Sequence, residues 1–221
     1  MPYRLLRAEQ KFSKYQWIEA RVQKARNDTR LESFNPDRDS IKPLSGVLST
    51  DKEWQARKDL VYPLKSPSLC QLMRRRDQDD EPTLGIFKPA LIKRLIIEED
   101  AERDWTADQK NILSQGDLFD AAPKEELKKI PFKFRYEFEC SDAECNGHKM
   151  ICTDWEMGEL YRKVQQSHGE GWQAPFRKRY EQEMIQRFDT HFYVGTLHQY
   201  PDTWIVVGLF YPLPVRQQQL F

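Results

Sequence analysis

The 221-residue sequence has no long hydrophobic run, and none approaches the roughly 18 apolar residues that a membrane-spanning helix needs. Its first residues, MPYRLLRAEQKF, contain no apolar segment followed by a small-residue cleavage site, so we expect no secretory signal. Only four cysteines are present, and three of them lie between residues 140 and 152. So few thiols are typical of a reducing compartment. These absences predict a cytoplasmic protein without membrane contact.

The common signatures of catalysis and phosphate binding are also missing. The nine glycines are scattered, and they form neither a glycine-rich phosphate loop nor a Gly-x-Ser-x-Gly nucleophile elbow. This weakens an enzymatic interpretation without excluding one. The net charge does not indicate what the protein binds, because 35 Lys and Arg balance 35 Asp and Glu. Binding of nucleic acid then depends on where the charge is placed.

Charged residues (32 %) and aromatic residues (12 %) are what the sequence does contain. The aromatics suffice to build a core, and the order of helix and strand signals predicts an α+β fold with antiparallel-rich sheets and helices packed on one face. We expect two closely associated parts. They are an N-terminal α+β part with a basic loop (1–100) and a C-terminal β-β-α-α-β-β part with a Cys/His loop (131–221), joined by an acidic and lysine-rich connector (101–130).

Local patterns place the individual elements. The segment FKFRYEFEC (132–140) alternates strictly between apolar and polar residues, which predicts a half-buried strand. Asp154 and Ser66 are expected to cap helices, and a polar, turn-rich loop is expected over 24–40. The same patterns predict strands over 15–22, 41–48, 84–87, 91–97, 149–153, 191–197 and 204–211. They predict helices from residues 51, 67, 107, 124, 155 and 174.

The strongest local constellation is Cys140-x4-Cys145-x2-His148-x3-Cys152. Zinc is held by four such ligands in a tetrahedron, and a short loop between two strands can supply them. Gly147 would allow the loop to turn tightly. The spacing matches no common zinc finger or knuckle, and Cys152 could instead be an ordinary buried thiol in the returning strand. We therefore predict a structural zinc. The alternatives are a loop of reduced cysteines, or a ligand held by Cys140, Cys145 and His148 alone.

Three residues are weak catalytic candidates. His148, Asp154 and Glu156 could hold a metal ion for phosphodiester hydrolysis, which would make the protein a metal-dependent nuclease. The simpler explanation is that acidic residues in the first turn of a helix complement its dipole. The enzyme question therefore stays open, and the sequence inclines against catalysis.

The N-terminal third offers a candidate surface for nucleic acid. Residues 1–30 carry eight Lys and Arg against three Asp and Glu, and cations can contact phosphates while aromatic rings stack on bases. The alternative is that neighbouring acidic residues pair with these cations in a solvated network. The candidate residues are Tyr15, Trp17, Lys24, Arg26, Asn27, Arg30 and Arg38.

Two further features bear on partners. The C-terminal tail PLPVRQQQLF (212–221) ends in two apolar residues, which could dock on a protein partner. The alternative is a disordered tail. The stretches FKFRYEFEC, CNGH, DWE and VGLFYPL resemble uncharacterised bacterial proteins of mobile or defence loci, which form no characterised family.

These observations lead to one leading hypothesis and two alternatives. We expect a nucleic-acid-associated accessory or binding protein, acting on DNA or RNA within a bacterial defence or nucleic-acid-processing complex. The first alternative is the metal-dependent nuclease. The second is a protein-binding subunit without nucleic-acid contact.

Overall fold

The computed structural model describes residues 3, 6–28, 30–76, 78, 82–114 and 128–214. Its centre is an antiparallel sheet with the order β6-β7-β8, formed by β6 (Leu91–Glu99), β7 (Phe132–Glu139) and β8 (His148–Ile151). The predicted alternation in β7 is confirmed, because Phe134, Tyr136 and Phe138 are all buried. This face of the sheet forms the main core.

A second antiparallel sheet continues that core. It has the order β10-β9-β5 and consists of β5 (Leu84–Phe87), β9 (His191–Thr196) and β10 (Trp204–Phe210). A bridge between Cys152 and Val206 connects it to the end of β8. The Phe192 ring packs 5.1 Å from Tyr136 and 5.2 Å from Phe138, so the two sheets share one set of aromatic contacts.

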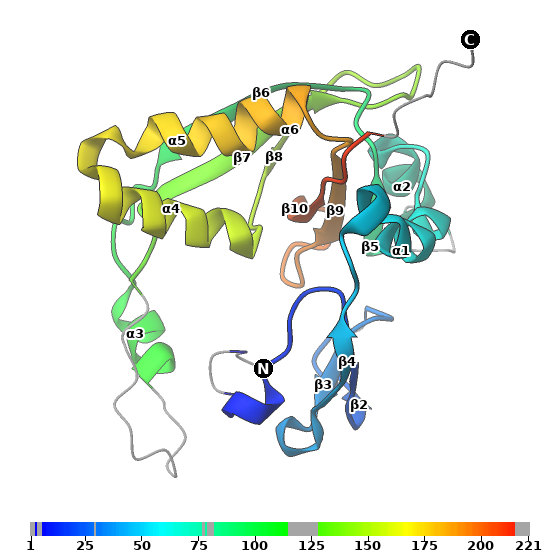
Figure 1. Cartoon of the computed structure of the whole chain (residues 1–221), viewed down its shortest axis with the longest axis vertical. Coiled ribbons are helices and arrows are strands. Elements are labelled where there is room, and N and C mark those ends of the chain that lie inside the picture. The colour runs from blue at the N-terminus through cyan, green and yellow to red at the C-terminus, as the bar shows by residue number, and fades with distance from the viewer. Residues whose placement is uncertain are drawn as a thin grey trace.

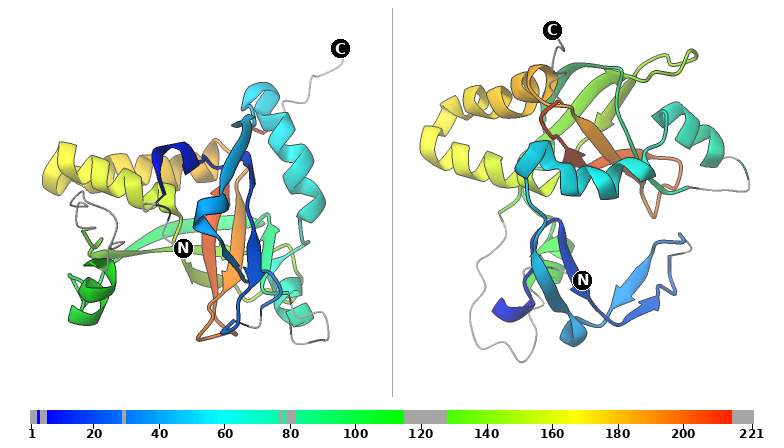
Figure 2. Two further views of the ribbon diagram at one scale, coloured as in Figure 1. Left: turned by 90° about the horizontal axis from the view of Figure 1, so that it is seen from below. Right: turned by 45° about the vertical axis from the view of Figure 1, so that its right-hand side comes forward.

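Helices cover the β6-β7-β8 sheet on one side (Figure 1). They are α4 (Trp155–His168), α5 (Gln173–Arg177), a π-helical segment (Lys178–Glu183) and α6 (Met184–Gln186). Figure 2 shows that α4 and the α5–α6 segment run beside each other. Asp154 caps α4 as predicted, by accepting the backbone N–H of Met157. Phe176 stacks on Phe134 at 4.6 Å and fixes the helices to β7.

Two further helices pack near β5. The first, α1, spans Asp51–Val61, but Lys52, Glu53 and Trp54 have left-handed backbone angles, so the regular right-handed helix begins only after them, later than the sequence predicts. The second, α2 (Leu69–Arg76), begins two residues later than expected, because the Ser68 hydroxyl and not Ser66 accepts the N–H of Gln71. Leu72 of α2 lies so close to Gly85 that a Cβ there would be 2.6 Å from Leu72 Cδ1. The missing side chain at Gly85 therefore permits α2 to approach β5 closely.

The N-terminal region contains two small antiparallel pairs. They are β1 (Gln16–Glu19) with β4 (Lys42–Val47), and β2 (Val22–Lys24) with β3 (Phe34–Pro36). The expected single strand over 15–22 is therefore wrong. The expected loop over 24–40 is also wrong, because it contains the end of β2 and all of β3. Strands of three residues give almost no periodic signal. Asp28 stabilises the hairpin end by accepting from Ser33 and by pairing with Arg30 at 2.6 Å.

The overall class is the predicted one, a mixed α+β fold with antiparallel sheets. Helix α3 (Ala107–Ser114) lies in the expected connector, whereas residues 115–127, including most of the expected helix over 124–129, lie outside the described residues. The tail over 215–221 also lies outside them. None of the helices in the described part of the chain has the length and apolar character required to cross a bilayer.

Candidate metal centre

A tight loop between β7 and β8 carries two cysteines and a histidine. Cys140 follows the last residue of β7, and His148 is the first residue of β8. Between them, the backbone N–H of Cys145 donates to the carbonyl of Asp142 at 3.1 Å. Gly147 has a φ of +86°, a left-handed conformation that favours glycine. The loop therefore turns back within a few residues, as its sequence predicts.

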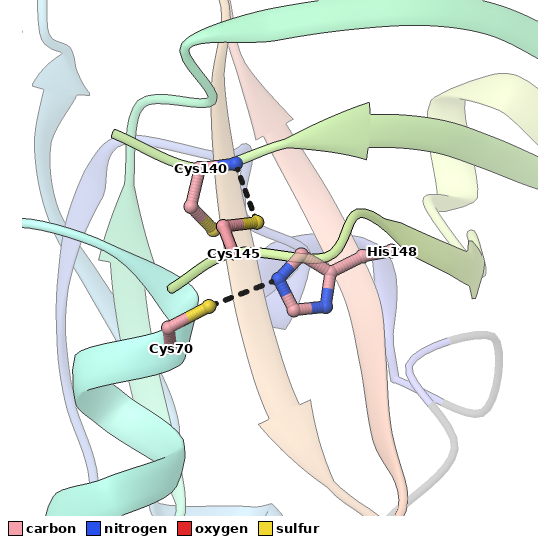
Figure 3. Close-up of side chains that lie close together, drawn as sticks. All are labelled: Cys70, Cys140, Cys145 and His148. Carbon is pink, nitrogen blue, oxygen red and sulfur yellow. Dashed lines mark hydrogen bonds between the residues drawn. The ribbon is translucent and has the colours of Figure 1, made fainter. Parts of the chain in front are cut away.

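The fourth member of the group comes from a distant part of the chain. Cys70 lies in the first turn of α2, and its Sγ is 3.3 Å from Nε2 of His148 (Figure 3). The ligand atoms of Cys70, Cys140, Cys145 and His148 all lie within 4.8 Å of one another. Three thiols and one imidazole therefore converge on a single point.

This spacing can be compared with that around a tetrahedral ion. Zn–S bonds of about 2.3 Å and Zn–N bonds of about 2.0 Å place neighbouring ligand atoms roughly 3.5–3.8 Å apart. The observed cluster, with atoms no more than 4.8 Å apart, needs only small side-chain adjustments to reach that geometry. The arrangement is compatible with a structural metal, and four protein ligands would leave no open coordination position.

Burial is the largest influence on the ionisation of the clustered side chains. Burial raises the pKa of Cys70 to about 12, and burial likewise raises the pKa of Cys140. Burial acts in the same direction on Cys145, but the backbone N–H groups of Cys140 and Gly147 outweigh it and lower that pKa. Burial lowers the pKa of His148, which keeps the imidazole neutral as a metal ligand requires. A bound cation would stabilise the thiolates that burial otherwise disfavours.

Polar contacts hold α2 against the loop and so position Cys70. Asp142 accepts from the Arg74 guanidinium at 2.5 Å and from the Ser68 hydroxyl at 3.3 Å. The Ser141 hydroxyl donates to the carbonyl of Pro67 at 3.0 Å, one turn before the cysteine. Hydrogen bonds from Ser68 and Arg74 to Asp142, and from Ser141 to Pro67, thus connect α2 and the turn before it to the loop, independently of any metal.

The structure brings together three of the four predicted metal ligands, Cys140, Cys145 and His148, but not Cys152. In an extended chain the side chain of Cys152 would point to the same face as that of His148. The separation of four residues between these positions, however, places Cys152 roughly 13 Å further along the strand. It is buried in the core, where its backbone bridges to Val206. Cys70 takes the fourth position. No local spacing signals that role, because 70 residues separate it from Cys140 in the sequence.

The three catalytic candidates, His148, Asp154 and Glu156, do not form a common metal-binding cluster. His148 belongs to the cysteine cluster, and no other group of three metal-ligating side chains is found in the described part of the chain. Asp154 uses both carboxylate oxygens to accept backbone N–H groups, from Met157 at 3.0 Å and Leu209 at 2.9 Å. Glu156 accepts from a tyrosine hydroxyl. Asp154 and Glu156 thus have structural partners in place of a shared metal.

The nucleic-acid candidates fall into two groups. Trp17 is 56 % exposed, and Lys24, Arg26 and Asn27 are exposed on the hairpin, although the Lys24 ammonium also donates to the carbonyl of Arg30. The other group is engaged within the protein. Tyr15 lies half-buried with its hydroxyl 3.3 Å from that of Tyr193.

Arg30 and Arg38 belong to the engaged group. Arg30 pairs with Asp28 and also donates to the carbonyl of Thr196 at 2.7 Å, which fixes the hairpin end to β9. Arg38 is half-buried, and its carbonyl accepts from the Gln10 amide at 2.7 Å. These contacts leave the exposed group as the accessible part of the predicted surface.

Comparison with known families divides the chain into two regions, each matched by its own family model. The family model described as Domain of unknown function (DUF8757) matches residues 65–221, more than half of the sequence, so the chain belongs to this family. A second model, described as Domain of unknown function (DUF8758), matches residues 1–63. No curated protein and no solved structure matches the chain. The chain therefore has no characterised family, and its connection with mobile or defence loci stays a prediction.

The four clustered residues all fall within the DUF8757 region. The two models adjoin near residue 64, whereas the sequence patterns place a connector over 101–130. Because much of that connector lies outside the described residues, the predicted boundaries stay predictions.

Proposed function

We propose that the protein binds one zinc ion at Cys70, Cys140, Cys145 and His148, and that this zinc is structural. The convergence of the four ligand atoms within 4.8 Å carries the proposal. Thiolate and imidazole ligands select zinc among the abundant divalent ions, whereas magnesium and calcium prefer oxygen. The ion would connect α2 to the β7–β8 loop.

Substitution by cobalt tests the ligand set directly. Tetrahedral Co²⁺ with thiolate ligands absorbs visible light strongly, whereas Co²⁺ surrounded by oxygen ligands does so weakly. The protein loaded with Co²⁺ is expected to show the intense bands, and Cys145→Ala should weaken them. Weak bands typical of oxygen coordination would contradict the assignment.

We further propose that the protein is a nucleic-acid-binding accessory protein that contacts its partner through the N-terminal region. Residues 1–63 carry 13 Lys and Arg against 9 Asp and Glu, so the positive charge of this balanced chain is concentrated there. Trp17 and Phe34 are 56 % and 49 % exposed on the two small strand pairs. Exposed rings beside cations are what single-stranded nucleic acid requires for stacking and phosphate contact.

The local geometry supports this surface. Trp17 and Leu44 adjoin the Ile18–Pro43 pair of β1 and β4, where the register is irregular between Gln16 and Ile18, and both side chains are exposed. On the hairpin, the Lys24 ammonium lies 5.4 Å from the centre of the Phe34 ring. A ring and a cation therefore stand side by side at the surface.

Salt-dependent binding separates this proposal from a protein-binding subunit. A fluorescent single-stranded oligonucleotide, offered as DNA and as RNA, should bind with an affinity that falls as the salt concentration rises. Trp17→Ala should weaken binding by roughly tenfold, since stacking contributes about 1–3 kcal/mol per base. Lys24→Gln should reduce the salt dependence. Arg187→Gln, a change to an exposed arginine in the helical region, serves as the control.

Two results would contradict the proposal. One is the absence of binding to both oligonucleotides at low salt. The other is binding that Trp17→Ala and the control variant leave equally unchanged. Either result would favour a protein partner for the exposed apolar residues.

A further inference from the structure

A large apolar groove separates the N-terminal segment from the β10-β9-β5 sheet. Its volume is about 1390 Å³. The floor is formed by β5, β9 and β10, with Leu84 and Val207 exposed toward the open space. The chain around Lys14, helix α1 and the start of α4 form the walls. Pockets that bury small molecules are typically about 300–1000 Å³ and mostly apolar, so this groove can hold one.

Aromatic rings dominate the walls. Trp54 lies 6.3 Å from Tyr15 and 5.2 Å from Tyr211, measured between ring centroids. Trp155 is 63 % exposed at the rim, an unusual position for so large an apolar side chain. Flat apolar walls of this kind favour a flat apolar ligand.

Most of the charged side chains on the walls have hydrogen-bond or ion-pair partners within the protein. Lys14 lies 3.8 Å from Glu156 and also donates to the carbonyl of Leu209 at 3.1 Å. Glu156 accepts from the Tyr211 hydroxyl at 2.9 Å. Asp154 accepts two backbone N–H groups. The charged groups of Lys14, Glu156 and Asp154 therefore all have partners within the protein.

Arg57 is the exception. Its guanidinium carbon lies 4.4 Å from the Tyr15 ring centre and 4.7 Å from that of Trp54, so aromatic contacts hold it in place. Nε donates to the carbonyl of Leu48 at 2.8 Å. Within the described part of the chain, its two terminal nitrogens have no hydrogen-bond acceptor. A fixed guanidinium with free donors is suited to a carboxylate, sulfonate or phosphate.

We propose that this groove binds a small aromatic acid. The ring system lies against the apolar floor between the walls, and the anionic group pairs with Arg57. The proposal is independent of the zinc site and of the nucleic-acid surface, because it uses none of the residues assigned to either beyond the wall residue Tyr15.

A matched pair of ligands tests both halves of the proposal. The probes are 2-naphthoate and the neutral 2-naphthalenemethanol, which share a ring system and differ in charge. Binding is measured by quenching of tryptophan fluorescence and by calorimetry on the full-length protein. The acid is expected to bind roughly tenfold more tightly than the alcohol, because a hydrogen bond between two charged groups is stronger than one to a neutral hydroxyl.

Three variants locate the site. Arg57→Gln should remove the preference for the acid. The acid loses its charged partner in this variant, whereas the affinity for the neutral alcohol should change little. Val207→Trp should weaken both probes by filling the floor, and it acts at an exposed strand position that tolerates a ring. Arg187→Gln is the matched control and should change neither affinity. Thermal melts of each variant confirm that it is folded.

The outcomes divide clearly. Tighter binding of the acid, lost in Arg57→Gln and blocked in Val207→Trp, supports the proposal. Equal binding of acid and alcohol by the unmodified protein would overturn the assignment of Arg57. Failure of both probes to bind at millimolar concentration, or binding unaffected by Val207→Trp, would overturn the groove as the site.

Discussion

Asp154 is a buried carboxylate with two structural roles. It caps α4 through the N–H of Met157 and ties that helix to β10 through the N–H of Leu209. Burial raises its pKa, yet the two donated hydrogen bonds give the carboxylate partners in the core. Asp154, which the sequence suggested as a catalytic candidate, thus joins a helix to a strand.

Substitution of Asp154 should therefore reduce stability. Asp154→Ala leaves two buried N–H groups without an acceptor, and we expect a loss of about 2–4 kcal/mol in the free energy of unfolding. Urea denaturation measures it. Glu159→Gln, at a half-exposed position on the same helix, should cost under about 0.5 kcal/mol. Equal stability of the two variants would contradict the structural role.

His191 makes stability depend on pH. Burial lowers its pKa below the ordinary value of 6.5, while Asp189 acts in the opposite direction and Lys65 and Lys88 add to the lowering. Its Nδ1 lies 2.8 Å from the carbonyl of Asp189, so the neutral ring donates there. Below pH 6.5 the unfolded chain takes up this proton more readily than the folded one, so acidification favours unfolding.

Replacing the ring removes that dependence. In His191→Asn the amide nitrogen can keep the hydrogen bond of Nδ1, but it does not titrate. The stability of the unmodified protein should fall more steeply than that of the variant as the pH drops below 6.5, and the two curves should run parallel above it. Denaturant midpoints across this range give the difference. Curves that stay parallel throughout would show that His191 is not responsible.

At the scale of elements, the position of α2 determines whether Cys70 can reach the cluster. Its docking depends on the close approach to Gly85 and on Asp142, which holds both Arg74 and Ser68. Groups that support a metal ligand often change affinity by about 10–100-fold when removed. Asp142 does not contact the ligand atoms, so it acts only by positioning.

We expect Asp142→Ala to weaken zinc binding by roughly tenfold while leaving one zinc per chain at saturation. Competition with a chromogenic chelator measures the affinity. Glu137→Gln is the control, because Glu137 lies on β7, outside the loop, and pairs with Arg94 of the neighbouring strand β6. Unchanged zinc affinity in Asp142→Ala would mean that α2 is held by other contacts.

The elements also show what sequence patterns can and cannot predict. Long alternating or capped segments, such as β7 and α4, were predictable because their periodicity and caps are local properties. The β2–β3 hairpin was not, since its strands are too short to carry a period and are joined by polar contacts such as Asp28 with Arg30. Cys70 was missed because its partnership exists only after α2 packs on the loop.

At the scale of the whole molecule, the proposed zinc would connect segments that are distant in the sequence. It would join α2, near the start of the DUF8757 region, to the central sheet. A ligand that binds only the folded state adds stability that grows with its concentration. The stability of the whole region should therefore depend on zinc.

Chelation should lower the melting temperature. With free zinc held a thousandfold above its dissociation constant, linkage predicts about 4 kcal/mol of stabilisation, or roughly 10 °C for a chain of this size. Thermal unfolding with and without chelator measures the shift, and added zinc should reverse it. Calcium chelation alone should have no effect. A melting temperature insensitive to zinc would place the cluster outside the elements that unfold cooperatively.

Zinc content measured by elemental analysis on three purified proteins tests the central claim most directly. The unmodified protein and Cys152→Ala should each contain one zinc per chain, and Cys70→Ala should contain little or none. Cys152→Ala is the matched control because it removes a buried thiol that lies outside the cluster. Loss of zinc from Cys152→Ala with retention by Cys70→Ala, or no zinc in the unmodified protein after expression in zinc-supplemented medium, would contradict the account.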